Sequence, residues 1–371
     1  MLGKGFNYNF GANLQAYALQ HVVSSLGDYC EIIDYVPPHG LFKAFQRNLQ
    51  YKGIRYAVSR VISIRLEEFN KKIIIKKKDA DAMIQGSNNF RGQHLNFSSK
   101  TFQGFNDLSD HSKYDVYIAG SDLIWAPWFN DWETLRVYLL GFVKEGRRVS
   151  YGAVVGKWIP RWARPIFREY LEKFYLVSVR DEMSAKALRE FTQDDIEVVL
   201  DPVALLRKKE WFNLLGPPRK EPKKPYVLVY DICRFKDIQR EMKHVARKKG
   251  WNLVTYIPSK DSFSFYSFDP LEFLWLYQNA DFAVSSSFHG TVFSVLFNRP
   301  FYAVDPSPIA SEFRIRDFLE KLNLRDRFVE PKKLRLMKFD EPDWSLANSC
   351  LENERQRSLN FLKRALRGVE E

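Results

Sequence analysis

The sequence is poor in cysteine and has no long uninterrupted apolar run. Its three cysteines, Cys30, Cys233 and Cys350, are far apart and form no CxxC pair, which argues against a disulfide-stapled secreted scaffold and favours a cytoplasmic protein. The chain opens without the charged and apolar regions of a signal peptide, so none is expected. Its six histidines are scattered without metal-ligand spacing, and we predict no obligatory metal and no cofactor.

Positive charge and aromatic residues are abundant instead. Lys and Arg number 57 against 45 Asp and Glu, a net charge of +12, and 15% of the 371 residues are aromatic. This composition excludes a disordered or low-complexity chain, because it supplies ample apolar surface to bury. The length predicts two domains, since single cores stop growing near about 250–300 residues. The charge indicates an anionic partner: a nucleic acid, an acidic membrane or a phosphorylated substrate.

Most of the net charge lies in one segment, 47–78. It holds ten basic and two acidic residues, a net charge of +8, with apolar residues interleaved. We expect one or two basic amphipathic helices here, whose polar face either is simply solvated or docks on anionic lipid at the inner face of the membrane. No recognised nucleic-acid motif accompanies the charge, so a nucleic-acid partner is not expected.

Short apolar runs alternate with amphipathic stretches, which predicts parallel sheets covered by helices on both faces. Strands are expected at 31–35, 116–119, 149–154, 176–179, 198–200, 226–230, 253–257, 282–285 and 301–304. The segment 216–225, GPPRKEPKKP, suits neither a helix nor a central strand. We therefore predict an N-terminal α/β domain at 1–215, a linker at 216–225, a C-terminal α/β domain at 226–330 and a helical tail at 331–371.

The stretch NYNFGANLQAYALQ, at 7–20, predicts a turn that opens a helix. Backbone N–H groups near Gly11 and Asn13 would face outward there and could receive an anion or a sugar hydroxyl. Together with Asn9, these residues are candidates for lining a cleft and contacting a ligand. The simpler interpretation is a capped helix with no ligand.

Two predicted strands run directly into polar or charged residues. YDVYIAGSDLIWAP, at 114–127, leads to Ser121 and Asp122, and LVSVRDEMSAKAL, at 176–188, leads to Arg180. Ligands of α/β proteins bind at the carboxyl ends of parallel strands, and an arginine there can hold a carboxylate or phosphate with two hydrogen bonds. Each residue also has a simpler interpretation, Asp122 as a helix N-cap and Arg180 as half of a surface ion pair.

The most informative stretch is ADFAVSSSFHGTVFSVLFNRPFYAV, at 280–304. An apolar strand leads into serines that end at Ser287, then into His289 and Gly290, before an apolar helix expected from Thr291. This order places a proton-transfer group beside helix N-terminal amides that can bind an anion. A structural histidine is the alternative.

Taken in order, these stretches resemble the polysaccharide pyruvyl transferase family. The match spans almost the whole chain and includes NYNFGANLQAYALQ, IAGSD with Trp125, SYGAVVG, SVRDEMS, LDPVALL, SSSFHGTVFSVLFNRPF and FRIRDFLEKLNLRDR. The resemblance implies two Rossmann-like domains that face a cleft, as in the GT-B glycosyltransferases. The chain departs from the family pattern at Leu123, where members often have glutamine, and at Ser287, where some have arginine.

The activity that the resemblance implies is transfer of pyruvate from phosphoenolpyruvate onto two hydroxyls of a glycan or lipid-linked sugar acceptor, forming a cyclic ketal on a cell-surface polysaccharide or its precursor. His289 and Arg180 carry over as catalytic residues. Donor-binding residues would be Gly290, Thr291, Ser287 and, as a weaker candidate beside Arg316, Arg314. A nucleotide-sugar glycosyltransferase of the same architecture and an inactive paralogue are the alternatives.

Overall fold

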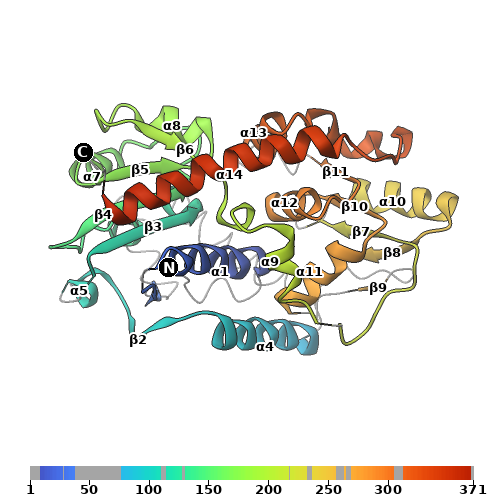
Figure 1. The fold of residues 1–371 in the computed structure, drawn as a ribbon, viewed down its shortest axis with the longest axis horizontal. Coiled ribbons are helices and arrows are strands. Elements are labelled where there is room, and N and C mark those ends of the chain that lie inside the picture. The colour runs from blue at the N-terminus through green and yellow to red at the C-terminus, as the bar shows by residue number, and fades with distance from the viewer. Residues whose placement is uncertain are drawn as a thin grey trace.

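The computed structural model describes residues 9–27, 29–37, 77–109, 114–127, 130–216, 218–231, 236–255, 263–264, 269–304 and 312–368. Their strands form three sheets (Figure 1). The first sheet pairs β1 (Ile32–Tyr35) with β2 (Phe97–Phe102). The second has the order β3 (Val116–Asp122), β4 (Arg147–Ala153), β5 (Leu176–Val179) and β6 (Ile196–Val198). The third has the order β12 (Phe328–Val329), β11 (Phe301–Val304), β10 (Phe282–Ser285), β7 (Tyr226–Tyr230), β8 (Asn252–Thr255) and β9 (Phe263–Ser264).

Every strand pair among the described residues is parallel. Strand β7, with the sequence YVLVY, is buried along its whole length, as expected for a strand covered on both faces. The predicted α/β fold class is confirmed: parallel sheets alternate with helices along the chain and form two halves. The predicted linker at 216–225 falls between the second and third sheets along the chain.

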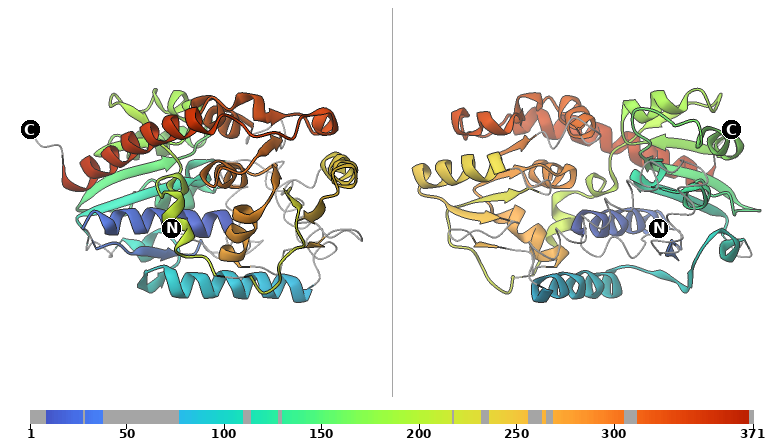
Figure 2. Two further views of the ribbon diagram at one scale, coloured as in Figure 1. Left: turned by 45° about the vertical axis from the view of Figure 1, so that its right-hand side comes forward. Right: turned by 180° about the vertical axis from the view of Figure 1, so that it is seen from behind.

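Helices cover the sheets and join the two halves (Figures 1 and 2). On the N-terminal half these are α1 (Phe10–Ser25), α4 (Lys77–His94), α5 (Phe105–Leu108), α6 (Trp132–Tyr138), α7 (Arg164–Leu171), α8 (Glu182–Leu188) and α9 (Lys208–Phe212). On the C-terminal half they are α10 (Lys236–Lys249), α11 (Pro270–Asn279), α12 (Phe288–Leu296) and α13 (Glu312–Lys321), and the last helix, α14 (Trp344–Arg367), extends from this half to the second sheet. The 3-10 turns are η2 (Leu123–Trp125), η3 (Pro202–Ala204), η4 (Arg325–Arg327) and η5 (Pro331–Leu336).

Two helices connect the halves. Helix α1 buries Leu14, Ala18 and Val22 and contacts α4, α11 and η3. Helix α14 runs across the top of Figure 1 from the C-terminal half to the second sheet, where Ser358 Oγ accepts a hydrogen bond of 2.9 Å from the backbone N–H of Leu200. Burial of apolar side chains from both ends of the chain therefore holds the second and third sheets in one arrangement.

Most of the basic segment lies outside the described residues, so the expected amphipathic helices and their membrane contact stay a prediction. Only its last two positions, 77 and 78, are described, as the start of α4. Within the described part of the chain, no helix is both long and apolar enough to cross a membrane.

Candidate functional site

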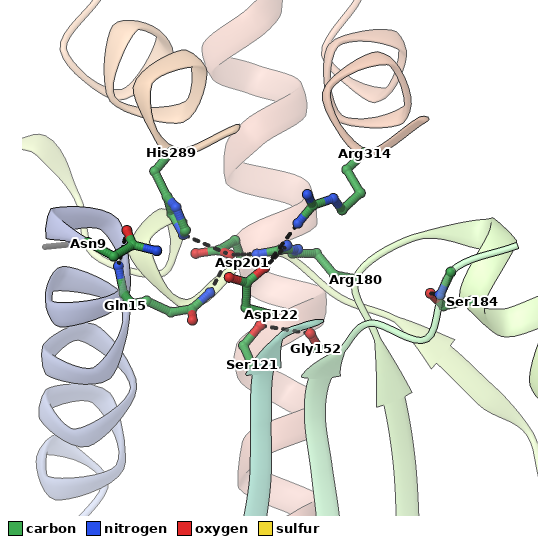
Figure 3. Close-up of polar contacts among 12 residues, drawn as sticks. Asn9, Gln15, Ser121, Asp122, Gly152, Arg180, Ser184, Asp201, His289 and Arg314 are labelled. Carbon is green, nitrogen blue, oxygen red and sulfur yellow. Dashed lines mark hydrogen bonds and ion pairs between the residues drawn. The ribbon is translucent and has the colours of Figure 1, made fainter. Parts of the chain in front are cut away.

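The charged residues predicted from the strand ends meet between the second sheet and the helices of the C-terminal half (Figure 3). Asp122 is the last residue of β3 and Arg180 directly follows β5, so both lie at the carboxyl edge of one sheet. Across from them, α12 contributes His289 and α13 contributes Arg314. Residues separated by up to 192 positions thus converge on one point.

Asp122 joins the two arginines. Its Oδ1 accepts a hydrogen bond of 2.7 Å from Arg180 Nη2 and one of 2.9 Å from Arg314 Nη1. Burial acts to raise the pKa of the Asp122 carboxyl, but the two arginines hold it below its ordinary value. Asp122 has a φ of 69°, a region that residues with a side chain rarely adopt and that is frequent at functional sites. Its predicted alternative role as a helix N-cap is not observed, because it makes no side-chain cap bond to η2.

Asp201 is the most connected residue of the site, and sequence reasoning did not single it out. It is fully buried, pairs with Arg180 Nη1 and accepts a hydrogen bond of 2.7 Å from Gln15 Nε2. Its other oxygen caps η3 through the backbone N–H of Val203 at 3.0 Å. Burial acts to raise the pKa of Asp201, but Arg180 and His289 hold it far below its ordinary value. Its only sequence signal was its place in LDPVALL.

Arg180 is held on several sides. Its side chain is 2% exposed, and its guanidinium lies over the ring of Phe288, 4.3 Å from the centroid. Burial acts to lower the pKa of Arg180, but Asp122 and Asp201 raise it, so the charge is permanent. The surface ion pair considered as an alternative is therefore ruled out for this residue.

His289 lies in the first turn of α12, which begins at Phe288 rather than at the expected Thr291. Its Nε2 is 3.6 Å from Asp201 Oδ2, longer than a hydrogen bond but close enough for the carboxylate to face the ring. The other side of the ring packs against Gly11 of α1, where any Cβ would overlap Nδ1 and Cγ. The glycine predicted to line the cleft thus makes room for the histidine.

The start of α1 is capped, as the simpler interpretation of its motif suggested. Asn9 Oδ1 accepts a hydrogen bond of 3.1 Å from the backbone N–H of Ala12, and Asn13 Nδ2 donates to Asn9 O at 3.2 Å. Asn13 is 1% exposed, and its Oδ1 has no hydrogen-bond partner among the described residues. A buried amide oxygen without a partner is costly, which keeps Asn13 a candidate for contacting a ligand.

Other predicted site residues make contacts within the protein. Ser121 Oγ donates to Gly152 O at 2.7 Å, and the backbone N–H of Ser287 donates to Ser285 Oγ at 3.0 Å. Both the amide and the hydroxyl of Thr291 donate to Ser287 O, so neither is the outward donor that the sequence suggested. Gly290 packs so tightly that a Cβ would overlap the hydroxyls of Ser285 and Tyr277.

The site is built from charged and hydrogen-bonding groups rather than from a metal cluster. Across the residues that the structure describes, no three His, Cys, Asp or Glu side chains are placed to hold a metal ion. What the geometry offers is two guanidinium groups, two carboxylates and one imidazole at the carboxyl edge of a parallel sheet. Such a set can bind a small anion and move a proton.

Fold and site together define an α/β protein whose candidate site lies between two parallel-sheet halves. The family model for polysaccharide pyruvyl transferase matches residues 9–308, and the chain belongs to that family. This range contains Asp122, Arg180, Asp201 and His289, while Arg314 lies just beyond it.

Comparisons with individual proteins give only distant likenesses. No curated protein gives a significant match to the sequence. Among solved structures, S. aureus MnaA with UDP is similar at 10% identity and a TM-score of 0.46, covering 80% of this chain and 88% of that one. MurG of Acinetobacter baumannii is similar at 11% identity and a TM-score of 0.40, covering 75% of this chain and 87% of that one.

Proposed function

We propose that the protein transfers pyruvate from phosphoenolpyruvate onto two hydroxyls of a sugar acceptor and releases phosphate. The observation that supports this is that His289, Arg180 and Arg314 converge on Asp122 and Asp201. This cluster lies at the carboxyl edge of the second sheet. Phosphoenolpyruvate carries a carboxylate and a phosphate, and guanidinium groups bind both with paired hydrogen bonds.

The reaction needs one proton delivered and two removed. A proton added to the methylene carbon of phosphoenolpyruvate leaves a cation-like centre at C2, which a sugar hydroxyl attacks as it gives up its proton. The C2–O bond to phosphate then breaks, and the second hydroxyl attacks C2 and loses its proton to close the ketal. An imidazole has an ordinary pKa of about 6.5, which suits proton transfer near neutral pH. We assign proton transfer to His289.

The aspartates act through their neighbours. Asp201 is a positioning residue, because it contacts Arg180, Gln15 and the edge of His289 from a fully buried place. Asp122 sets the spacing of the two arginines by accepting from both. Arg314 is the more accessible of these cations, with a side chain 11% exposed against 2% for Arg180. We therefore assign donor binding to Arg314 first, with Arg180 as its fixed neighbour.

The test is phosphate release from phosphoenolpyruvate, with and without a panel of sugar acceptors, followed by mass analysis for a ketal on the acceptor. We expect acceptor-dependent release by the natural protein and its loss in His289→Asn. His244→Asn is the matched control, because His244 is exposed on α10. Arg180→Lys, which keeps the charge but loses the paired geometry, should reduce the rate by about 10²–10³.

Other results would refute the proposal. Turnover of nucleotide sugars without use of phosphoenolpyruvate would support a glycosyltransferase, and full activity in His289→Asn would refute the site. Absence of both activities, with the protein folded and the acceptor panel broad, would support an inactive paralogue. A cytoplasmic location and contact of segment 47–78 with anionic membrane complete the proposal, since both would bring the enzyme to a lipid-linked acceptor.

A further inference from the structure

The loop after β4 presents an exposed tryptophan. Trp158 is 58% exposed, the largest exposed fraction among the tryptophans that the structure describes. Its neighbours Lys157 and Arg161 are also exposed. Single apolar side chains on a surface are common, so exposure alone says little, and the position of Trp158 in the fold decides what it means.

That position is in the loop that leaves the carboxyl end of β4. The sheet order places β4 between β3 and β5, so the loop leaves the sheet between Asp122 and Arg180. The backbone N–H of Val154 still donates to Asp122 O at 2.8 Å. Trp158 follows four residues later, and four residues of chain span at most about 14 Å. Trp158 therefore lies within the reach of a short oligosaccharide from the ion pairs of the site.

The loop is also fixed to the protein on both sides of Trp158. The backbone N–H groups of Val155 and Gly156 donate to Ser184 Oγ of α8, at 3.1 and 3.3 Å. After the tryptophan, Ile159 and Ala163 are buried in the core of the N-terminal half. An anchored backbone presents the indole with little ordering left to do on binding, which favours affinity.

We infer that Trp158 is a stacking platform for an outer sugar ring of the acceptor glycan, next to the ring that is modified. The inference rests on the proposed function for the place of the acceptor. A pyranose ring has an apolar C–H face and a rim of hydroxyls, so its face packs on indole while Lys157 and Arg161 can donate to rim oxygens. Covering about 55 Å² of apolar surface at about 25 cal/mol per Å² corresponds to about tenfold in affinity.

The experiment measures binding to an immobilised panel of hexose and N-acetylhexosamine mono-, di- and trisaccharides, in the absence of phosphoenolpyruvate. We expect the natural protein to bind some of the longer members about tenfold more tightly than their single sugars, and Trp158→Ala to lose that difference. Trp158→Phe should keep most of it. Tyr29→Ala is the control, because Tyr29 is 76% exposed but lies before the amino end of β1, a strand of the separate first sheet.

The outcomes separate this inference from the proposed function. Equal binding of the panel by Trp158→Ala and the natural protein, or no binding of any member, would overturn the platform. Binding that depends on Trp158 without phosphate release would leave the platform standing and refute pyruvyl transfer. Acceptor-dependent phosphate release with an unchanged acceptor KM in Trp158→Ala would support pyruvyl transfer and refute the platform.

Discussion

Replacing Asp201 with asparagine tests the centre of the candidate site. The carboxylate is fully buried and accepts from Arg180, Gln15 and the backbone N–H of Val203. Asparagine keeps the shape but removes the charge, so Arg180 is left in a buried place with Asp122 as its remaining carboxylate. Removing one partner of a buried ion pair costs about 3–5 kcal/mol. Because Asp122 still compensates part of the Arg180 charge, we expect the free energy of unfolding to fall by about 3 kcal/mol, near the lower end of this range.

The measurement is the free energy of unfolding in urea, extrapolated to zero denaturant, with an unchanged slope as evidence that the variant folds normally. Asp195→Asn is the control, because Asp195 is exposed and a surface substitution changes stability by about 0.5 kcal/mol or less. The pH dependence gives a second readout. A carboxyl whose folded pKa lies below its ordinary value of 3.8 stabilises the protein above that pH, and the contribution declines as the pH falls below it.

The difference between natural protein and Asp201→Asn should therefore be full at pH 7 and shrink below about pH 4. A loss smaller than about 1 kcal/mol at pH 7 would refute the reasoning, since it would mean that Arg180 does not depend on this carboxylate. A difference that stays constant down to pH 3 would show that asparagine acts through packing and not through charge.

Two further substitutions probe the surroundings of the site. Gly11→Ala should sharply reduce turnover, because the added Cβ would displace the His289 ring. Gly92→Ala in α4 is the control: the position has open space around it, so turnover should stay unchanged. Equal steady-state rates for the two variants would contradict the placement of the His289 ring. Asp317→Asn should stabilise the protein at pH 7 by about 1 kcal/mol, because burial and the nearby Asp181 raise the Asp317 pKa to about 6. Thermal melts should show this gain above pH 6 and its loss as the pH falls towards 4; a destabilised Asp317→Asn would contradict it.

The sequence was sufficient for elements whose pattern is local. Apolar runs predicted β7, β10 and β11 at the residues observed, and β6 only about two residues away from its true place. Strand β2, with the sequence FSSKTF, was missed because three of its six residues are exposed. A strand at the edge of a small sheet needs few apolar residues, so periodicity cannot reveal it.

The candidate site shows the same contrast between residues with a local sequence signal and residues without one. Asp122, Arg180 and His289 could be proposed as candidates from the sequence because each stands at the end of an apolar strand or the start of a helix. Asp201 was not, because its partners Arg180 and Gln15 are 21 and 186 residues away. The choice between Arg314 and Arg316 also needed the tertiary structure, in which Arg316 pairs with Glu320 on the surface at 3.1 Å while Arg314 reaches Asp122.

The net charge of +12 says little about this site, because the described cations there are already compensated. Arg180 and Arg314 contribute two positive charges, and Asp122 and Asp201 contribute two negative charges at contact distance. Over these four side chains the charges sum to zero, so an excess of positive charge is not what would attract an anionic donor to this place. Binding of a phosphorylated carboxylic acid would depend instead on the directed, paired hydrogen bonds of the two guanidinium groups.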